Sequence, residues 1–147
     1  GVGVPLDETF KSLPIGKAEV LVEGNDLLIV AVGNRVHPAF EAAAVLSDSG
    51  ISVTVINARF IKPLDEELIC AYADQIGRVI TVEDHTLDGG FGSAILEVLS
   101  THGILAKVKR LGIPNRFVQH GDMKMLYNIC GYDEEAIINE GVKICEK

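Results

Sequence analysis

The amino-acid sequence predicts an α/β domain: a three-layer sandwich in which helices cover both faces of a five-stranded, mostly parallel sheet. Short apolar or β-branched segments alternate along the chain with segments of helical period, as in parallel sheets with crossover helices. The segment LLIVAV at residues 27–32 contains no polar residue, which is typical of a strand covered on both faces. A chain of 147 residues has the length of one domain and can bury a core without a disulfide or metal.

The strands are expected where apolar and β-branched residues run between polar or glycine-containing turns. They lie at residues 18–23, 27–32, 52–58, 78–82 and 106–111. The turn Gly24-Asn25-Asp26 separates the first two strands, and so short a connection favours a hairpin between them. Glycine and proline punctuate residues 1–16, which we interpret as an extended lead-in strap before a domain at residues 17–147.

Five helices are expected from apolar spacing and from end signals. They span about residues 38–49, 64–76, 91–102, 122–130 and 133–145. Pro38 suits the first turn of a helix, and Gly50 and Gly77 stand where two of the helices should stop. Acidic residues at 65–67 favour a helix N-terminus there. Right-handed crossovers then place helices on both faces of the sheet.

Composition excludes several classes of function. The chain carries 13 Lys+Arg against 21 Asp+Glu, a net charge of −8, so nucleic acid and anionic membrane surfaces are not expected as partners. No apolar run reaches the roughly 18 residues of a membrane helix, and no signal peptide is visible. Cys70, Cys130 and Cys145 form no C-x-x-C pair. We interpret them as small packed hydrophobes rather than reactive thiols, and we expect a cytoplasmic protein, or a plastid protein if the source is a plant.

Polar residues follow the predicted parallel strands, at the edge where such sheets meet ligands and partners. These residues are Asn34, Arg35, His37, Arg59, Lys62, Glu83, Asp84, His85, Asn115, Arg116 and His120. We therefore expect the functional face of the domain at this edge.

Three kinds of site can be weighed at this edge. A dinucleotide site needs G-x-G-x-x-G, but the turn at residues 33–38 has a single glycine and no P-loop occurs. Residues 83–85 and Asp88 include metal-ligand types, yet consecutive strand residues point in opposite directions. We therefore interpret these carboxylates as caps of neighbouring loops. No G-x-S-x-G nucleophile elbow occurs either.

The stretch LDGGFG at residues 87–92 is the most unusual local sequence. Its glycines permit a positive φ and a close approach of backbone, and a helix N-terminus, which favours anions, follows. Since no lysine or arginine accompanies the stretch in the sequence, we interpret it as a tight turn packed against a neighbouring domain, with φ above zero at one glycine.

Three longer motifs carry a resemblance to a known family. They are ARFIKPLD at residues 58–65, TVEDH at 81–85 and GGFGS at 89–93, and together they resemble the C-terminal domain of the transketolase superfamily. LPIGK at 13–17, LGIPNRF at 111–117 and His120-Gly121 narrow the resemblance to the third domain of the 1-deoxy-D-xylulose-5-phosphate synthases. The resemblance covers nearly the whole chain, with Asn115 standing where that family usually has aspartate.

The resemblance implies a mixed five-stranded sheet whose first strand runs antiparallel beside the third, in conflict with the hairpin expected above. It also implies that the whole enzyme uses thiamine diphosphate and Mg²⁺ to join pyruvate, with loss of CO₂, to glyceraldehyde 3-phosphate. The product is a precursor of isoprenoids, thiamine and pyridoxal. In that family the cofactor is held by preceding domains, so we expect no catalytic, cofactor-binding or metal-ligating residue in this chain and no activity from it alone.

The resemblance further implies a homodimer in which this edge meets the preceding domains or the partner subunit. The candidate residues for such contacts are Arg59, Lys62, Glu83, His85, Gly89 and Gly90. Two alternatives stay open: the C-terminal domain of a transketolase or of a 2-oxo-acid dehydrogenase β subunit, and a stand-alone protein-interaction module.

Overall fold

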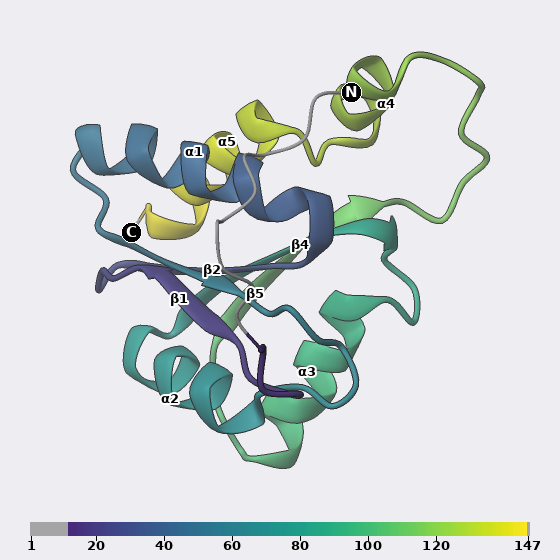
Figure 1. The fold of residues 1–147 in the computed structure, drawn as a ribbon. Helices are drawn as coiled ribbons and strands as arrows, with labels where there is room; N and C mark the ends of the chain where they lie inside the picture. The colour runs from purple at the N-terminus through teal and green to yellow at the C-terminus, as the bar shows by residue number, and fades with distance from the viewer. Residues whose placement is uncertain (1–11, 147) are drawn as a thin grey trace.

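The computed structural model describes residues 12–146, so most of the predicted lead-in strap lies outside the described residues. Strands and helices alternate along the chain as predicted (Figure 1). In chain order the elements are β1 (Glu19–Val22), β2 (Leu27–Ala31), the short 3-10 helix η1 (Gly33–Arg35), α1 (Val36–Asp48), β3 (Val53–Asn57), α2 (Glu66–Ile76), β4 (Arg78–Thr86), α3 (Phe91–Thr101), β5 (Lys107–Ile113), α4 (Met123–Cys130) and α5 (Glu134–Cys145). Within this described part, none of the helices combines the length and the apolar character needed to cross a bilayer.

The five strands form one sheet in the order β1-β3-β2-β4-β5. β1 pairs antiparallel with β3, and the remaining neighbours pair in parallel. The predicted fold class is therefore confirmed, including the antiparallel strand beside the third. The hairpin between the first two strands is wrong.

The turn between β1 and β2 explains why no hairpin forms. Its backbone is hydrogen-bonded to the start of β3: Gly24 N donates to Thr54 Oγ1 (2.9 Å), and Thr54 Oγ1 donates back to Gly24 O (2.7 Å). Asp26 N donates to Ser52 O (2.8 Å). The turn therefore passes over the start of β3, so that β1 and β2 lie on opposite sides of that strand. The turn lies so close to β3 that a Cβ on Gly24 would overlap the backbone of Val53. β2, buried along its whole length, gains a strand neighbour on each side and takes the centre of the sheet.

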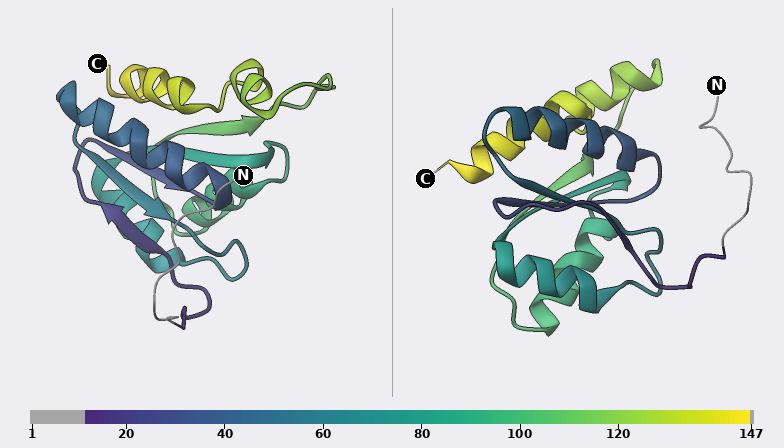
Figure 2. Two further views of the ribbon diagram at one scale, coloured as in Figure 1. Left: turned by 45° about the horizontal axis from the view of Figure 1, so that its top comes forward. Right: turned by 60° about the vertical axis from the view of Figure 1, so that its left-hand side comes forward.

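The alternation of side chains along β2 builds two separate cores. Leu27, Ile29 and Ala31 join the core under α1 and α5, whereas Leu28 and Val30 join the core under α2 and α3. All five side chains are fully buried, as expected when successive strand residues face opposite sides of a covered sheet. Figure 2 shows the resulting layers, with α1 and α5 on one face and α2 and α3 on the other.

The strand β4 is longer than expected. It continues to Thr86 rather than stopping near Val82, because it keeps β5 as a partner as far as Ile113, after a register irregularity. Glu83, Asp84 and His85 therefore lie within a strand instead of in a loop after it. Their alternation sends Glu83 and Asp84 to opposite faces of the sheet, which separates their roles.

Candidate functional site

A cleft of about 480 Å³ opens at the edge of the sheet where the parallel strands end. Five of the six predicted contact residues line it: Lys62, Glu83, His85, Gly89 and Gly90. The walls come from three places distant in sequence, namely the η1 turn, the connection between β3 and α2, and the segment from β4 into α3. The expected convergence of strand ends on one edge therefore holds for these residues.

Arg59 is the predicted residue that does not line this cleft. Its guanidinium lies 2.6 Å from a carboxylate oxygen of Glu19 on β1, and its side chain is 21% exposed. Its backbone is left-handed (φ 55°), a conformation uncommon outside glycine, and its N–H donates to the Asn57 side chain (3.1 Å). The structure thus gives Arg59 a partner within the domain; its contact with another domain or subunit stays a prediction.

Glu83 is fully buried and closes the N-terminus of α3. Its Oε2 accepts from the Phe91 N–H (2.6 Å), and its Oε1 accepts from the Gly92 N–H (2.8 Å). These are two of the N–H groups that a helix leaves without an internal partner, and a carboxylate is favoured there by the helix dipole. The interpretation of this carboxylate as a cap is confirmed. A carboxylate of the chain itself occupies the place that an external anion would take.

The glycine stretch forms a tight turn held by side chains. Gly89 has φ 72°, which confirms the expected positive φ. The Gly89 N–H donates to Ser93 Oγ (3.2 Å), which in turn donates to the carbonyl of Leu87 (2.9 Å). At Gly90 the constraint is space instead, because a Cβ there would overlap the carbonyl of Thr86 and the Glu83 carboxylate.

The sequence predicts that no basic residue accompanies this turn, and the structure shows that this is wrong, because an arginine distant in sequence contacts it. Arg110 on β5 reaches it, and its Nη1 donates to the Leu87 carbonyl (2.6 Å) and to Ser93 Oγ (2.8 Å). Sequence distance concealed this contact, since Arg110 lies 23 residues beyond Leu87. Both hydrogen bonds from Arg110 Nη1 go to oxygen atoms of the protein, so Arg110 stabilises the turn.

Asp84 accepts hydrogen bonds from three side chains that are distant from it in the sequence. Its Oδ2 accepts from Asn34 Nδ2 (2.7 Å) and from the Tyr127 hydroxyl (3.3 Å), and its Oδ1 accepts from the Tyr132 hydroxyl (2.9 Å). The buried guanidinium of Arg35 lies 3.8 Å from the centre of the Tyr127 ring, a favourable cation–π distance. The strand-end pattern predicts Asn34 and Arg35 at this edge but gives no sign of the two tyrosines, which lie on α4 and just after it.

These contacts also set the charge state of Asp84. Burial raises its pKa, whereas the hydrogen bonds from Asn34 and Tyr132 lower it. The charge of Arg35 and the hydroxyl of Tyr127 act in the same direction, so the pKa of this carboxyl lies below its ordinary value. The ionised form is therefore the one the fold stabilises.

We expect Asp84→Asn to destabilise the domain in a pH-dependent way. A lowered folded-state pKa stabilises the fold above the unfolded pKa, about 3.9, and that stabilisation is lost as the pH falls through the folded value. The difference in unfolding free energy between wild type and Asp84→Asn, from urea titrations, should be constant from about pH 7 to 5 and shrink below about pH 4. Asp88→Asn, at an exposed position, is the control. A difference that is unchanged at about pH 3 would contradict this account.

The three cysteines pack as partly buried side chains against the two cores, Cys130 and Cys145 on one and Cys70 on the other. Burial raises the pKa of the Cys70 thiol, as does the charge of Glu66. Burial also raises the pKa of the Cys145 thiol, so neither thiol is activated as a nucleophile. Among residues 12–146, no three His, Cys, Asp or Glu side chains are grouped so that they could hold a metal ion.

Comparison with known proteins finds a match over most of the chain. The family described as "Transketolase, C-terminal domain" matches residues 16–137. A 1-deoxy-D-xylulose-5-phosphate synthase of Halothermothrix orenii is 53% identical over 100% of this chain, and 1-deoxy-D-xylulose-5-phosphate synthase 1 of Geobacter sulfurreducens is 50% identical over 93% of it. The chain spans only 23% and 22% of the lengths of these two relatives.

Solved structures show the same fold. A split-gene transketolase, described as an inactive β4 tetramer, superimposes with a TM-score of 0.85 at 32% identity, covering 95% of this chain and 46% of the other. A transketolase from Leishmania mexicana gives a TM-score of 0.62 at 21% identity, over 88% of this chain and 18% of the other.

Proposed function

The chain belongs to the transketolase C-terminal domain family, and from this we propose that it is the C-terminal domain of a 1-deoxy-D-xylulose-5-phosphate synthase. The observation that supports the proposal most directly is 53% identity to such a synthase across the full length of this chain. The solved transketolase is less similar, at 32% identity. The whole protein would then be a thiamine-diphosphate-dependent transferase acting on pyruvate and glyceraldehyde 3-phosphate, and the domain would help to form its homodimer.

Thiamine diphosphate would supply the chemistry that removes CO₂ from pyruvate and transfers the remaining carbons. The described residues do not fit this cofactor and its Mg²⁺. The helix N-terminus nearest the cleft is already closed by Glu83, and residues 12–146 contain no group of three His, Cys, Asp or Glu side chains that could hold a metal ion. The proposed role of this domain is therefore structural: its cleft edge, with Lys62 and His85, would pack against the domains that hold the cofactor and Mg²⁺.

The proposal is tested by assaying the complete gene product. We expect it to form 1-deoxy-D-xylulose 5-phosphate and CO₂ from pyruvate and glyceraldehyde 3-phosphate when thiamine diphosphate and Mg²⁺ are present. Ketol transfer between sugar phosphates, without use of pyruvate, would favour the transketolase alternative, to which the structural similarity at 32% identity points. A gene product with neither activity would favour the interaction module.

The isolated 147-residue chain is expected to bind no thiamine diphosphate. The reason is the lack of fit just described: the α3 N-terminus is filled by the chain's own carboxylate. Calorimetric titration with thiamine diphosphate and Mg²⁺ should give no saturable heat, and the complete protein serves as the positive control. Saturable binding by the isolated chain at micromolar cofactor would refute this division of labour.

A further inference from the structure

An apolar surface lies on the segment that projects from the sandwich between β5 and the end of α4. We call residues 114–130 the α4 arm; Figure 1 shows it extending beyond the layers. Phe117 is fully exposed, and Met123, Met125 and Ile129 are 53%, 61% and 49% exposed. A hollow of about 250 Å³ runs beside Phe117, Met125 and Ile129, and α4 itself has no buried residue. Such a concentration of exposed apolar side chains marks an interaction surface.

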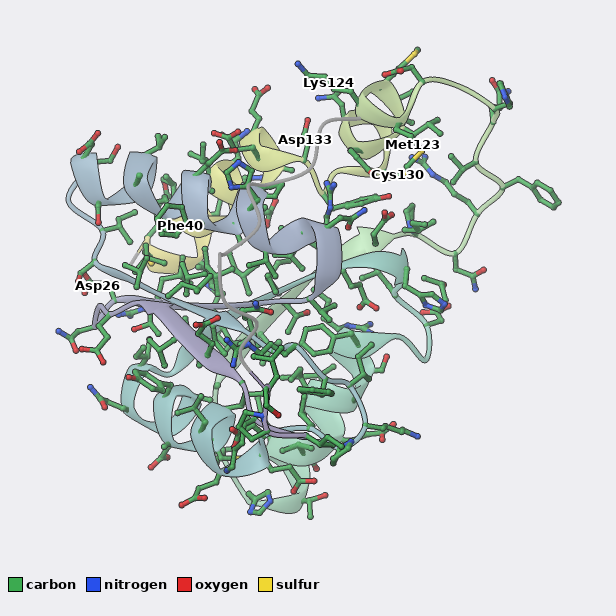
Figure 3. All side chains as sticks on the ribbon, viewed as in Figure 1. Asp26, Phe40, Met123, Lys124, Cys130 and Asp133 are labelled. Carbon is green, nitrogen blue, oxygen red and sulfur yellow. The ribbon has the colours of Figure 1, made fainter. Side chains whose placement is uncertain are left out.

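The α4 arm is held in a fixed orientation. Arg116 Nη2 donates to the carbonyl of Ile129 (2.9 Å), closing the arm on itself. Asp122 caps α4 through the Lys124 N–H (3.0 Å). At its other end the Tyr127 hydroxyl donates to Asp84 (3.3 Å), and the Tyr127 ring lies against Arg35. Figure 3 shows Met123 and Lys124 on the α4 portion, away from the sheet. The surface is therefore preorganised, which lowers the cost of docking.

The start of the described chain lies at the same edge of the sheet as the arm. The Ala18 N–H donates to Asp65 Oδ2 (3.1 Å), and Lys17 Nζ lies 3.3 Å from Asp65 Oδ1. A Cβ on Gly16 would come within 2.8 Å of the Pro63 ring, so the lead-in lies directly on the connection between β3 and α2. β1 begins, and β5 ends, at the carboxyl edge of the parallel strands, although the two strands stand at opposite ends of the sheet. In the right-hand view of Figure 2, the lead-in leaves the sandwich beside the layer of α2 and α3, and α4 lies beside the layer of α1 and α5.

We propose that the apolar surface of the α4 arm docks the region of the same polypeptide that precedes this domain. The inference rests on the proposed function, under which most of the protein lies outside this chain: the chain spans 23% of the Halothermothrix orenii synthase. A covalently attached partner that enters at this edge has a high effective concentration at the arm. A second copy of the chain lacks this advantage.

Photo-crosslinking in the complete protein tests this. A benzophenone amino acid replaces Phe117, and a matched protein carries it at Leu105, which is 94% exposed on the loop between α3 and β5. Enzyme assembled from equal amounts of ¹⁵N-labelled and unlabelled protein then distinguishes crosslinks within one polypeptide from crosslinks between subunits. If the variant at Phe117 fails to fold, the probe is moved to Met125.

The expected result is a crosslink from the arm to peptides preceding residue 1, without mixed isotopes, and at least tenfold less of it from position 105. Crosslinks of mixed isotope composition, crosslinks confined to this domain, or equal yields from both positions would each overturn the proposal. The activity assay separates the two claims. A protein that makes 1-deoxy-D-xylulose 5-phosphate but lacks the crosslink refutes the docking surface alone, and an inactive protein that crosslinks as expected refutes the proposed function alone.

Discussion

Replacing Glu83 by alanine is expected to cost the domain about 2–6 kcal/mol of unfolding free energy. The carboxylate is fully buried and accepts from the N–H groups of Phe91 and Gly92. Alanine would leave both donors unpaired in the interior, and each unsatisfied buried donor costs about 1–3 kcal/mol. Because α3 packs through Phe91 and Ile95 into the core that it shares with α2, loss of its cap loosens that whole face.

Urea unfolding of the 147-residue chain measures this loss. Glu97→Ala, which removes an exposed carboxylate from the same helix, is the matched control and should stay within about 0.5 kcal/mol of wild type. Glu83→Gln retains one carbonyl acceptor and should fall between wild type and Glu83→Ala. If Glu83→Ala and Glu97→Ala were equally stable, the capping role would have to be abandoned.

The layers and most element bounds could be predicted because each depends on local signals. The unbroken apolar run of β2 predicts a strand covered on both faces, and it is fully buried. Gly77 predicts the end of α2 and is its left-handed C-cap. The order of β1 and β2 in the sheet could not be predicted in this way. A short turn favours a hairpin locally, but hydrogen bonds from Gly24 to Thr54, 30 residues away, decide the pairing.

At the candidate site, too, the local sequence predicts the position of the site but not the contacts within it. The edge itself was predictable, since parallel strands deliver their following residues to one side, and Lys62 and His85 do line one cleft there. The partners of the carboxylates were not predictable. Tyr127 and Tyr132 reach Asp84 from 43 and 48 residues away, and a tyrosine in a helical pattern gives no sign of which carboxylate it will meet.

Gly90→Val is expected to destabilise the domain by about 3 kcal/mol or more, for a reason different from the one at Gly89. Gly90 has an ordinary negative φ of −82°, but any Cβ there overlaps the Glu83 carboxylate and the carbonyl of Thr86. The valine must therefore displace the cap of α3. Gly89 has φ 72° and open space around its Cβ position, so Gly89→Ala should cost only the left-handed penalty of about 1–2 kcal/mol.

A double-mutant cycle tests whether Gly90 acts through Glu83. If valine destabilises the domain mainly by expelling the carboxylate, then little of that effect remains once Glu83 is alanine. The loss in Glu83→Ala/Gly90→Val should fall short of the sum of the single losses by about 1 kcal/mol or more, because residues in contact are not additive. Full additivity in urea unfolding would mean that the clash with the Thr86 carbonyl dominates.

In the complete enzyme, Gly90→Val should lower activity more than it lowers the melting temperature of the isolated domain, because the displaced turn lines the cleft that we propose packs against the cofactor-bearing domains.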